Sequence, residues 1–416
     1  MKKRASHSKR TFRWLLGAGL VGGGVLVGMI FALNTWPVLG AQGADLLRAV
    51  FGDKVVATLE AGVYRVQDTF QHWSYDLGWT APIFPAGAPS LVAIAPTAAS
   101  LSMTPASASS SPGLTAIAKS PATLTPNPPV PATPTNSPWH PGPLVPLGAL
   151  RGAGGWAPYI QDAAGRTVAF LTSFQPDPGR AYAVAAVVAF DLHHTRLHFV
   201  LGTIEPYAPD SPPRSGAIPK ADRSPGVLLA MFNGGFKSRH GQFGAMADGV
   251  VALPARDGLG TLAIDREGGL HIGAWGQDIL PSPDWVAWRQ NGPLVIHQGA
   301  INPRVYNDSP SDWGYTVGGA SPTWRSGIGL SADGMTLYYV CGPSLTIEAL
   351  ANSLLASGSA EAIQLDINNY WVHFVAVRTD GKNLILEPLF PGQMKENIDR
   401  YLWNYTRDYF YVTGEP

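Results

Sequence analysis

The sequence predicts an α+β fold of largely antiparallel sheets with packed helices, preceded by one transmembrane helix and a disordered linker. Three observations lead to this prediction. Short apolar runs separated by turns fill residues 146–416, an uncharged stretch occupies residues 14–33, and a segment rich in Ala, Pro, Ser and Thr lies between them at residues 81–145. The chain has 416 residues, which is enough for one large domain or two ordinary ones.

Pairs of apolar runs on either side of a short polar turn recur through the C-terminal part of the chain. Residues 328–330 and 337–340 flank Asp333-Gly334, and a second Asp-Gly pair stands between residues 375–377 and 384–386. Asp-Gly between apolar runs is typical of a hairpin, because the turn needs residues with positive φ. We expect hairpins at these two places and at two others, formed by residues 182–190 with 197–201 and by residues 262–264 with 270–272.

One helix is predicted by apolar residues at positions i, i+3, i+4 and i+7, namely Ile347, Leu350, Ala351 and Leu354. Ser344 or Thr346 can cap its start, and Gly358 can end it. The following residues, 362–365, are typical of a buried strand. Asp366 is therefore expected at the end of a strand, which is a usual position for a working carboxylate.

Residues 14–33 carry no charge, and twenty residues at helical rise span the hydrocarbon of a bilayer. The preceding tail, residues 1–13, is basic, so the positive-inside rule keeps it in the cytoplasm. We expect a single-pass membrane protein whose C-terminal domain is extracytoplasmic. The alternative is a cleaved signal peptide with a cleavage site at Ala41-Gln42-Gly43, but the apolar stretch is longer than a usual signal sequence.

Two segments connect this anchor to the domain at residues 146–416. Residues 44–80 predict an amphipathic helical stalk, interrupted near Gly52 and Gly62, which packs on itself, on the membrane or on the main domain. Residues 81–145 form a spacer with a single charged residue, Lys119, and too little apolar surface to offset the entropy of ordering.

Composition excludes several classes of function. The formal net charge of +0 provides no field that would attract nucleic acid. The only cysteine, Cys341, excludes an intrachain disulfide and a thiolate zinc cluster, and its apolar neighbours favour a buried structural role over that of a nucleophile. His193-His194 and His198 form no convincing metal pattern, so we expect neither a metal nor a cofactor.

Four constellations of polar residues can carry chemistry. Asn233 ends an apolar strand and precedes Gly234 and Gly235, which can expose backbone N–H groups to a ligand or simply form a turn. Asn291 begins an Asn-Gly turn that enters another strand. Arg325 stands just ahead of a buried strand, where it can present a fork to phosphate or form an ordinary salt bridge.

The fourth constellation follows the strand that ends at Asp366. This carboxylate can act as an acid, a base or a nucleophile, and Asn368 and Asn369 can bind hydroxyl groups. Tyr370 or Trp371 can stack on the face of a sugar. The alternative is that Asp366 only stabilises an Asx-type turn.

The order of these four segments resembles the phosphodiester glycosidase family over residues 183–374. In that family Leu-Asp is followed by three glycines and a serine, whereas this chain has Ile367-Asn368-Asn369-Tyr370. The matching segments are residues 233–236, 291–295, 325–334 and 347–366.

The resemblance implies a membrane-anchored glycosidase that hydrolyses sugar phosphodiesters or related glycosidic bonds in envelope material. Asp366, Arg325 and Asn233 would be catalytic, and substrate would bind at Gly234, Gly235, Asn291, Asn368, Asn369 and Tyr370. Asp366 would stabilise the oxocarbenium-like transition state. The alternative is a non-catalytic glycan-binding or exopolysaccharide-assembly module, which would suit the altered loop after Asp366.

Overall fold

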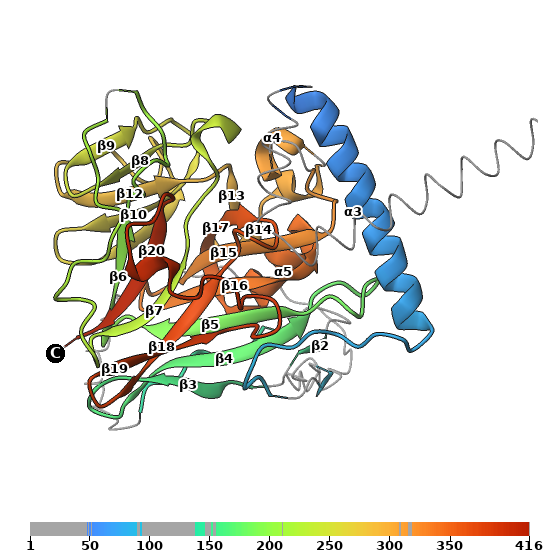
Figure 1. The fold of residues 1–416 in the computed structure, drawn as a ribbon, viewed down its shortest axis with the longest axis horizontal. Coiled ribbons are helices and arrows are strands. Elements are labelled where there is room, and N and C mark those ends of the chain that lie inside the picture. Colours follow the sequence, from blue (N-terminus) through green and yellow to red (C-terminus); the bar gives the residue numbers. More distant parts are fainter. Residues whose placement is uncertain are drawn as a thin grey trace, which may run out of the picture.

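The computed structural model describes residues 48, 50, 52–89, 92–93, 138–145, 151–152, 155–209, 211–307, 309–314 and 318–415 (Figure 1). The predicted cytoplasmic tail at residues 1–13 and the predicted anchor at residues 14–33 lie outside this part of the chain. Within the described residues, no helix is both long enough and apolar enough to cross a membrane.

Three sheets form the body of the molecule (Figure 1). The first contains β1(Val92–Ala93), β2(Arg151–Gly152), β4(Thr167–Gln175), β5(Ala185–Asp191), β16(Thr336–Leu345), β15(Thr323–Ser331), β17(Ser359–Ile367), β13(Leu294–His297) and β14(Ala300–Ile301) in that spatial order, with β3(Ala157–Gln161) beside β4. The second contains β11(Leu270–Ala274), β10(Gly260–Asp265), β12(Trp285–Gln290), β8(Ala245–Ala247) and β9(Val250–Leu253). The third contains β19(Asn383–Pro388), β18(Phe374–Asp380), β7(Leu228–Asn233), β20(Tyr409–Gly414) and β6(Thr195–Val200).

The pairings between these strands are antiparallel, as the Asp-Gly turns predict. β15 pairs with β16 across Gly334, and β18 pairs with β19 across Gly381, and both glycines have positive φ. The hairpin of β10 with β11 is also present. The predicted hairpin of residues 182–190 with 197–201 is wrong, because β5 pairs with β4 and β16 whereas β6 pairs with β20 in another sheet.

The predicted helix is α5(Ile347–Ser357). The Thr346 side chain accepts a hydrogen bond from the N–H of Ala349 at its start, and Gly358 ends it in the left-handed conformation. α5 packs its apolar residues against the first sheet, including Tyr338. The described part of the chain has fewer helices than an α+β fold leads one to expect, the others being α3(Asp53–Asp76), α4(Pro310–Trp313) and the 3₁₀ turns η1(Ser238–His240), η2(Pro303–Tyr306) and η3(Arg400–Leu402).

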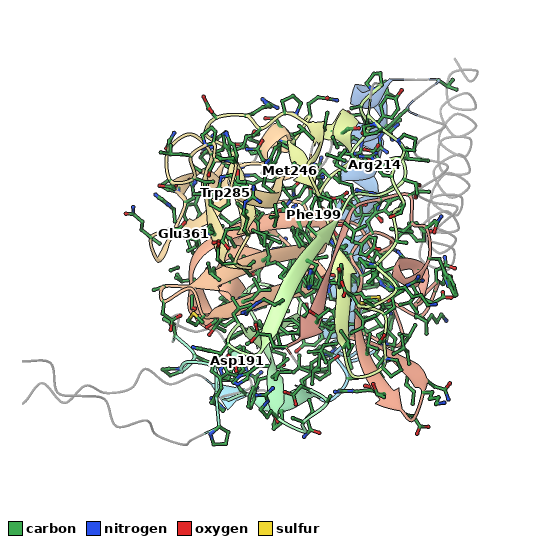
Figure 2. The ribbon with its side chains drawn as sticks, turned by 90° about the vertical axis from the view of Figure 1, so that its left-hand side faces the viewer. Asp191, Phe199, Arg214, Met246, Trp285 and Glu361 are labelled. Carbon is green, nitrogen blue, oxygen red and sulfur yellow. The ribbon has the colours of Figure 1, made fainter. Side chains whose placement is uncertain are left out.

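The main core lies where the sheets face one another. Its centre is a group of aromatic rings in which Phe232 contacts Tyr339, Phe374 and Phe410, with ring centroids 4.6 to 6.0 Å apart. These rings come from the first and third sheets, so their contact holds the two sheets together. Phe199 of β6, labelled in Figure 2, belongs to the same core and contacts Phe410.

The stalk predicted at residues 44–80 includes α3, which runs along the outside of the body (Figure 1). Gly52, with φ 79°, precedes the helix, as predicted, but the helix continues through Gly62 without interruption. A Cβ added at Gly62 would have no other atom within 4 Å, so the glycine is not needed for close packing. Its only cost to α3 is its lower intrinsic helix propensity. The described residues of the spacer predicted at residues 81–145 contact the body near its start and at its end. The N–H of Ala86 donates to the carbonyl of Leu389, and the N–H of Val145 donates to the carbonyl of Ala356.

Candidate functional site

Strand ends from all three sheets meet at one place. Asn233 ends β7 of the third sheet, Asn291 follows β12 of the second, and Asp366 lies next to the last residue of β17 in the first. Arg407 and Asp408 lie directly before β20. Hydrogen bonds link these residues across the sheets, so the fold concentrates polar groups where its three layers join.

Asp366 is buried at this junction with 5% of its surface exposed. Its Oδ2 lies 2.5 Å from Arg407 Nη2, and its Oδ1 accepts a hydrogen bond from the N–H of Ile367 at 2.8 Å. Burial raises the pKa of Asp366 to about 6, although Arg407 and the Ile367 N–H act in the opposite direction. The carboxyl group therefore changes charge near neutral pH, which is a property of functional carboxylates in buried sites.

Arg407 contacts Asp366 and the Trp371 ring, and a second cation lies near the same ring. Its guanidinium carbon lies 4.3 Å from the centre of the Trp371 ring, and Lys237 Nζ lies 4.9 Å from the same ring. Arg407 also donates to the carbonyl of Gly235 at 2.7 Å. Burial opposes its charge, but Asp366 and then Asp408 raise the pKa of Arg407 above its ordinary value. Two cations thus lie close to one ring beside the carboxylate.

Asp408 forms a second buried ion pair, with Arg289. Asp408 Oδ2 lies 2.8 Å from Arg289 Nε, and both side chains are fully buried. The same oxygen accepts the N–H of Gly235 at 3.0 Å, whereas Asp408 Oδ1 has no hydrogen-bond partner. Arg289 further donates to the carbonyls of Phe236 and Gln290. This pair connects the segment before β20 to the end of β12. The negative charge of Asp408 helps to raise the pKa of Asp366.

The loop after Asn233 uses its glycines to approach these charged side chains. A Cβ on Gly234 would lie 2.2 Å from Asp408 Oδ2, and one on Gly235 would lie 2.8 Å from Arg289. The N–H of Gly234 donates to the carbonyl of Asp408, and that of Phe236 donates to Asn291 Oδ1. The glycines predicted to face a substrate therefore face Asp408 and Arg289, with their N–H groups engaged.

The two predicted amides, Asn233 and Asn291, are buried and bonded within the protein. Asn233 donates to Ser326 Oγ and accepts from the hydroxyl of Tyr339. Ser326 in turn donates to the carbonyl of Asp366 at 2.8 Å. Asn291 donates to the carbonyl of Leu365, next to Asp366. Both amides therefore hold the end of β17 in place from either side.

Arg325 lies inside β15 rather than ahead of it, and its side chain has no exposed surface. The guanidinium donates to Gln364 Oε1 at 3.0 Å. Its other hydrogen bonds go to backbone carbonyl oxygens, those of Leu345, Trp313, Gly318, Gly319 and Ser321. Arg325 thus gathers three chain segments around one charge.

The loop after Asp366 contains the remaining predicted site residues. Asn368 has φ 84°, and its side chain accepts the N–H of Tyr370 at 3.0 Å, which is the geometry of an Asx turn. Tyr370 lies under the guanidinium of Arg400 at 5.0 Å and against Trp371. Asn368, Asn369 and Tyr370 are half-buried, so part of each reaches the surface beside Asp366.

Several cations surround His240 in η1. Burial, and then the charges of Arg239, Arg48, Arg407 and Lys237, together lower the pKa of His240 to about 3. The imidazole is therefore neutral at any physiological pH. Its pKa shows that the positive charges of Lys237 and Arg407 act on the same small region.

Tyr64 of α3 packs beside this region, against Phe236, Phe243 and Ile367. Burial and then Glu60 raise the pKa of the Tyr64 hydroxyl to about 12, and the hydroxyl makes a hydrogen bond with Thr323. The stalk helix therefore contacts residues on both sides of the candidate site, Phe236 after the glycine loop and Ile367 after Asp366.

The sequence interpretation gave no role to Arg407, Asp408, Arg289 or Lys237. A signal for the first two exists, since Arg407-Asp408 is a charged pair directly before an aromatic strand in a chain with only 14% charged residues. The described residues contain no group of three His, Cys, Asp or Glu side chains that could hold a metal ion. Cys341 is fully buried, as predicted, and burial raises the pKa of its thiol.

No protein-family model matches this chain, and no curated protein matches it by sequence. Three solved structures share features of its fold. The catalytic domain of zebrafish N-acetylglucosamine-1-phosphodiester alpha-N-acetylglucosaminidase, auto-inhibited by its pro-peptide, aligns with 64% of this chain and 84% of its own, at 14% identity and a TM-score of 0.38. A hypothetical protein from Synechocystis aligns with 62% of this chain and 64% of its own, at 9% identity and a TM-score of 0.32.

A putative exported protein from Burkholderia pseudomallei aligns with 56% of this chain and 74% of its own, at 11% identity and a TM-score of 0.26. All three alignments have TM-scores below 0.5 and identities below 15%, so the role of each site residue rests on the contacts described above.

Proposed function

We propose that this protein is a hydrolase of sugar phosphodiesters, held at the extracytoplasmic face of a membrane by residues 14–33, and that Asp366 is its catalytic carboxylate. One observation carries the proposal. Asp366 is buried, has a pKa of about 6 and contacts Arg407, which shares the Trp371 ring with Lys237. A carboxylate beside two cations suits a substrate in which an anionic phosphate leaves a sugar.

The proposed chemistry breaks the bond between the anomeric carbon and the phosphate oxygen. The ionised Asp366 stabilises the positive charge that develops on the sugar ring, and water supplies the new hydroxyl group and a proton. The phosphate monoester leaves as an anion and needs little help from a proton donor. Arg407 and Lys237 would bind it, because their charges lie 4.3 and 4.9 Å from the centre of the Trp371 ring, beside Asp366.

Arg407 takes the role in this proposal that the sequence suggested for Arg325. The donors of Arg325 are used by carbonyl groups, and Asn233 and Asn291 hold backbone and side-chain groups of the protein. We propose that these three residues position Asp366. Asn369 and Tyr370 would contact the sugar from the half-buried loop beside it.

The alternative is a module that binds envelope glycans or assists exopolysaccharide assembly without catalysis. The engaged N–H groups at Gly234, Gly235 and Phe236 favour it, because they leave no preformed backbone anion site in the loop. The packing of Tyr64 beside the site also favours the non-catalytic module.

The test is hydrolysis of a panel of synthetic sugar-1-phosphodiesters by the purified full chain in detergent. We expect turnover by the wild type and at least about a hundredfold loss in Asp366→Asn, in the range for removal of an acid–base group. Asp380→Asn makes the same change in an exposed hairpin turn and should have no effect. Turnover unaffected by Asp366→Asn would reject the catalytic role of this residue, and glycan binding without wild-type turnover would establish the alternative.

A further inference from the structure

Helix α3 is amphipathic in the reverse of the usual sense. The face that packs on the body is largely polar and aromatic, and includes Tyr64, Asp68, Gln71 and Tyr75, with Val56 as a buried apolar residue near its start. Asp68 pairs with Arg180 and accepts from the hydroxyl of Tyr182, and Gln71 accepts from Ser344 Oγ at 2.6 Å. Surface helices of soluble proteins instead place an apolar face on the core and a polar face outward.

The outward face of α3 is an apolar stripe, defined here as Val55, Val66, Phe70, Trp73 and Leu77. The last four have the spacing i, i+4, i+7 and i+11, which places them along one side of a helix. The body-facing residues have the same spacing and begin two residues earlier, so the two faces differ by roughly 200°. No member of the stripe is charged.

The apolar stripe is open to solvent along its whole length. Its five side chains are between 40% and 60% exposed, and Trp79 just beyond the helix is 66% exposed. Phe84 follows at 44% exposure and extends the apolar surface along the chain. Single exposed apolar residues are ordinary, but a continuous row of them marks a surface that another apolar phase covers.

Residue types and chain length identify that phase. Phe70, Trp73, Trp79 and Phe84 are aromatic, and Trp in particular concentrates at the boundary between lipid and water. Only 19 residues, 34–52, separate the uncharged stretch from the first residue of α3. Fully extended, they reach about 65 Å at most. A chain anchored by residues 14–33 therefore keeps the start of α3 within about 65 Å of the bilayer surface.

We infer that the apolar stripe of α3 lies in the interface of the lipid bilayer, with the helix parallel to the membrane plane. A helix with one apolar face and one polar face, too polar to cross the bilayer, is suited to this position. The inference rests on the membrane attachment in the proposed function but not on the catalytic activity. A coiled coil between two copies would instead favour aliphatic residues at the seam and charged residues beside it.

The full chain reconstituted in vesicles of phosphatidylethanolamine and phosphatidylglycerol provides the test. The only native cysteine, Cys341, is fully buried, so a cysteine placed at the surface can be labelled selectively with a fluorophore. Labels at Phe70→Cys and at Val66→Cys report on the stripe. Arg65→Cys is the matched control, since it is exposed on the same helix and lies roughly 140° away from position 70.

We expect lipids carrying nitroxide groups to quench the labels at positions 66 and 70 several-fold more strongly than the label at position 65. Equal quenching at all three positions in vesicle-bound protein would overturn the inference while leaving the anchor intact. Cross-linking between copies through position 70, without quenching by lipid, would also overturn it in favour of a helix pair. Failure of the wild-type chain to float with the vesicles would overturn both the anchor and the stripe.

Discussion

The arginines Arg325 and Arg407 are both buried, but their guanidinium groups have different partners. Arg325 is surrounded by backbone carbonyl oxygens and the side chain of Gln364, whereas Arg407 contacts a carboxylate, one carbonyl and an aromatic ring. The carbonyl groups around Arg325 are dipoles that are fixed by the fold. The surroundings of Arg407 contain Asp366, whose charge changes near neutral pH. The partners of a buried cation therefore distinguish a structural centre from a candidate site, while burial alone does not.

The largest effect is expected from Arg325→Lys. Lysine keeps the charge but cannot reach carbonyls on three segments at once, and hydrogen bonds to a charged group contribute about 1.5–3 kcal/mol each. We expect the free energy of unfolding to fall by about 3–5 kcal/mol, with kcat/KM of the folded fraction little changed. Denaturant unfolding of the full chain measures the first quantity. A stable variant with weakened binding of phosphodiesters would show that Arg325 belongs to the site after all.

The second prediction concerns pH. The folded pKa of Asp366 is raised to about 6 from an ordinary value of 3.8, so its contribution to stability is fully present below pH 3.8 and is lost as the pH rises through 6. The loss amounts to about 3 kcal/mol. Asp366→Asn cannot ionise, so its stability relative to the wild type should increase between pH 5 and pH 8. Parallel melting curves of the two proteins over this range would contradict the assignment.

Activity should follow the opposite course with pH. The proposed mechanism needs the ionised form of Asp366, so kcat/KM of the wild type should rise through about pH 6 and level off above it. Arg407 lowers the pKa of Asp366, so Arg407→Lys should move this midpoint upward and raise KM about tenfold through loss of the guanidinium fork. Initial rates from pH 5 to pH 8 measure both changes. A fall in rate above pH 6 would make Asp366 an acid instead.

The smallest effect is expected at His373, which lies outside the surroundings described above for Arg325 and Arg407. Burial and then Arg400 lower the pKa of this histidine well below 6.5, so its contribution to stability is present above pH 6.5 and is lost as the pH falls below it. The loss is at most about 1.4 kcal/mol per pH unit. His373→Phe should remove this dependence between pH 6.5 and pH 5.5, as measured by denaturant unfolding. An unchanged slope would assign the dependence to other groups.

Local patterns predict local structure in this chain and fail where the partner is distant. The turn at Asp380-Gly381 and the helix cap at Thr346 follow from neighbouring residues, and both are present. The hairpin of residues 182–190 with 197–201 is wrong because each run has a better partner far away, β16 for the first and β20 for the second. Adjacent apolar strands can belong to different sheets, and no local signal reveals it.

The candidate site shows the same limit. The prediction that Asp366 stands near a strand end follows from the apolar run before it, and the structure places it there. Its partner Arg407 is 41 residues further along the chain, before a strand of another sheet. Sequence reasoning selected Asp366 and Arg325 from the segments around them, but only the fold brings Arg407 to Asp366.

The two faces of α3 would set the distance between the candidate site and the bilayer. Tyr64 packs against the apolar cluster that contains Ile367, next to Asp366, while the stripe on the other face is proposed to rest on lipid. A helix about 10 Å across would then be all that separates the site from the bilayer. A substrate carried by the same membrane would reach this site by diffusion in two dimensions, at an effective concentration set by the membrane rather than by the surrounding solution.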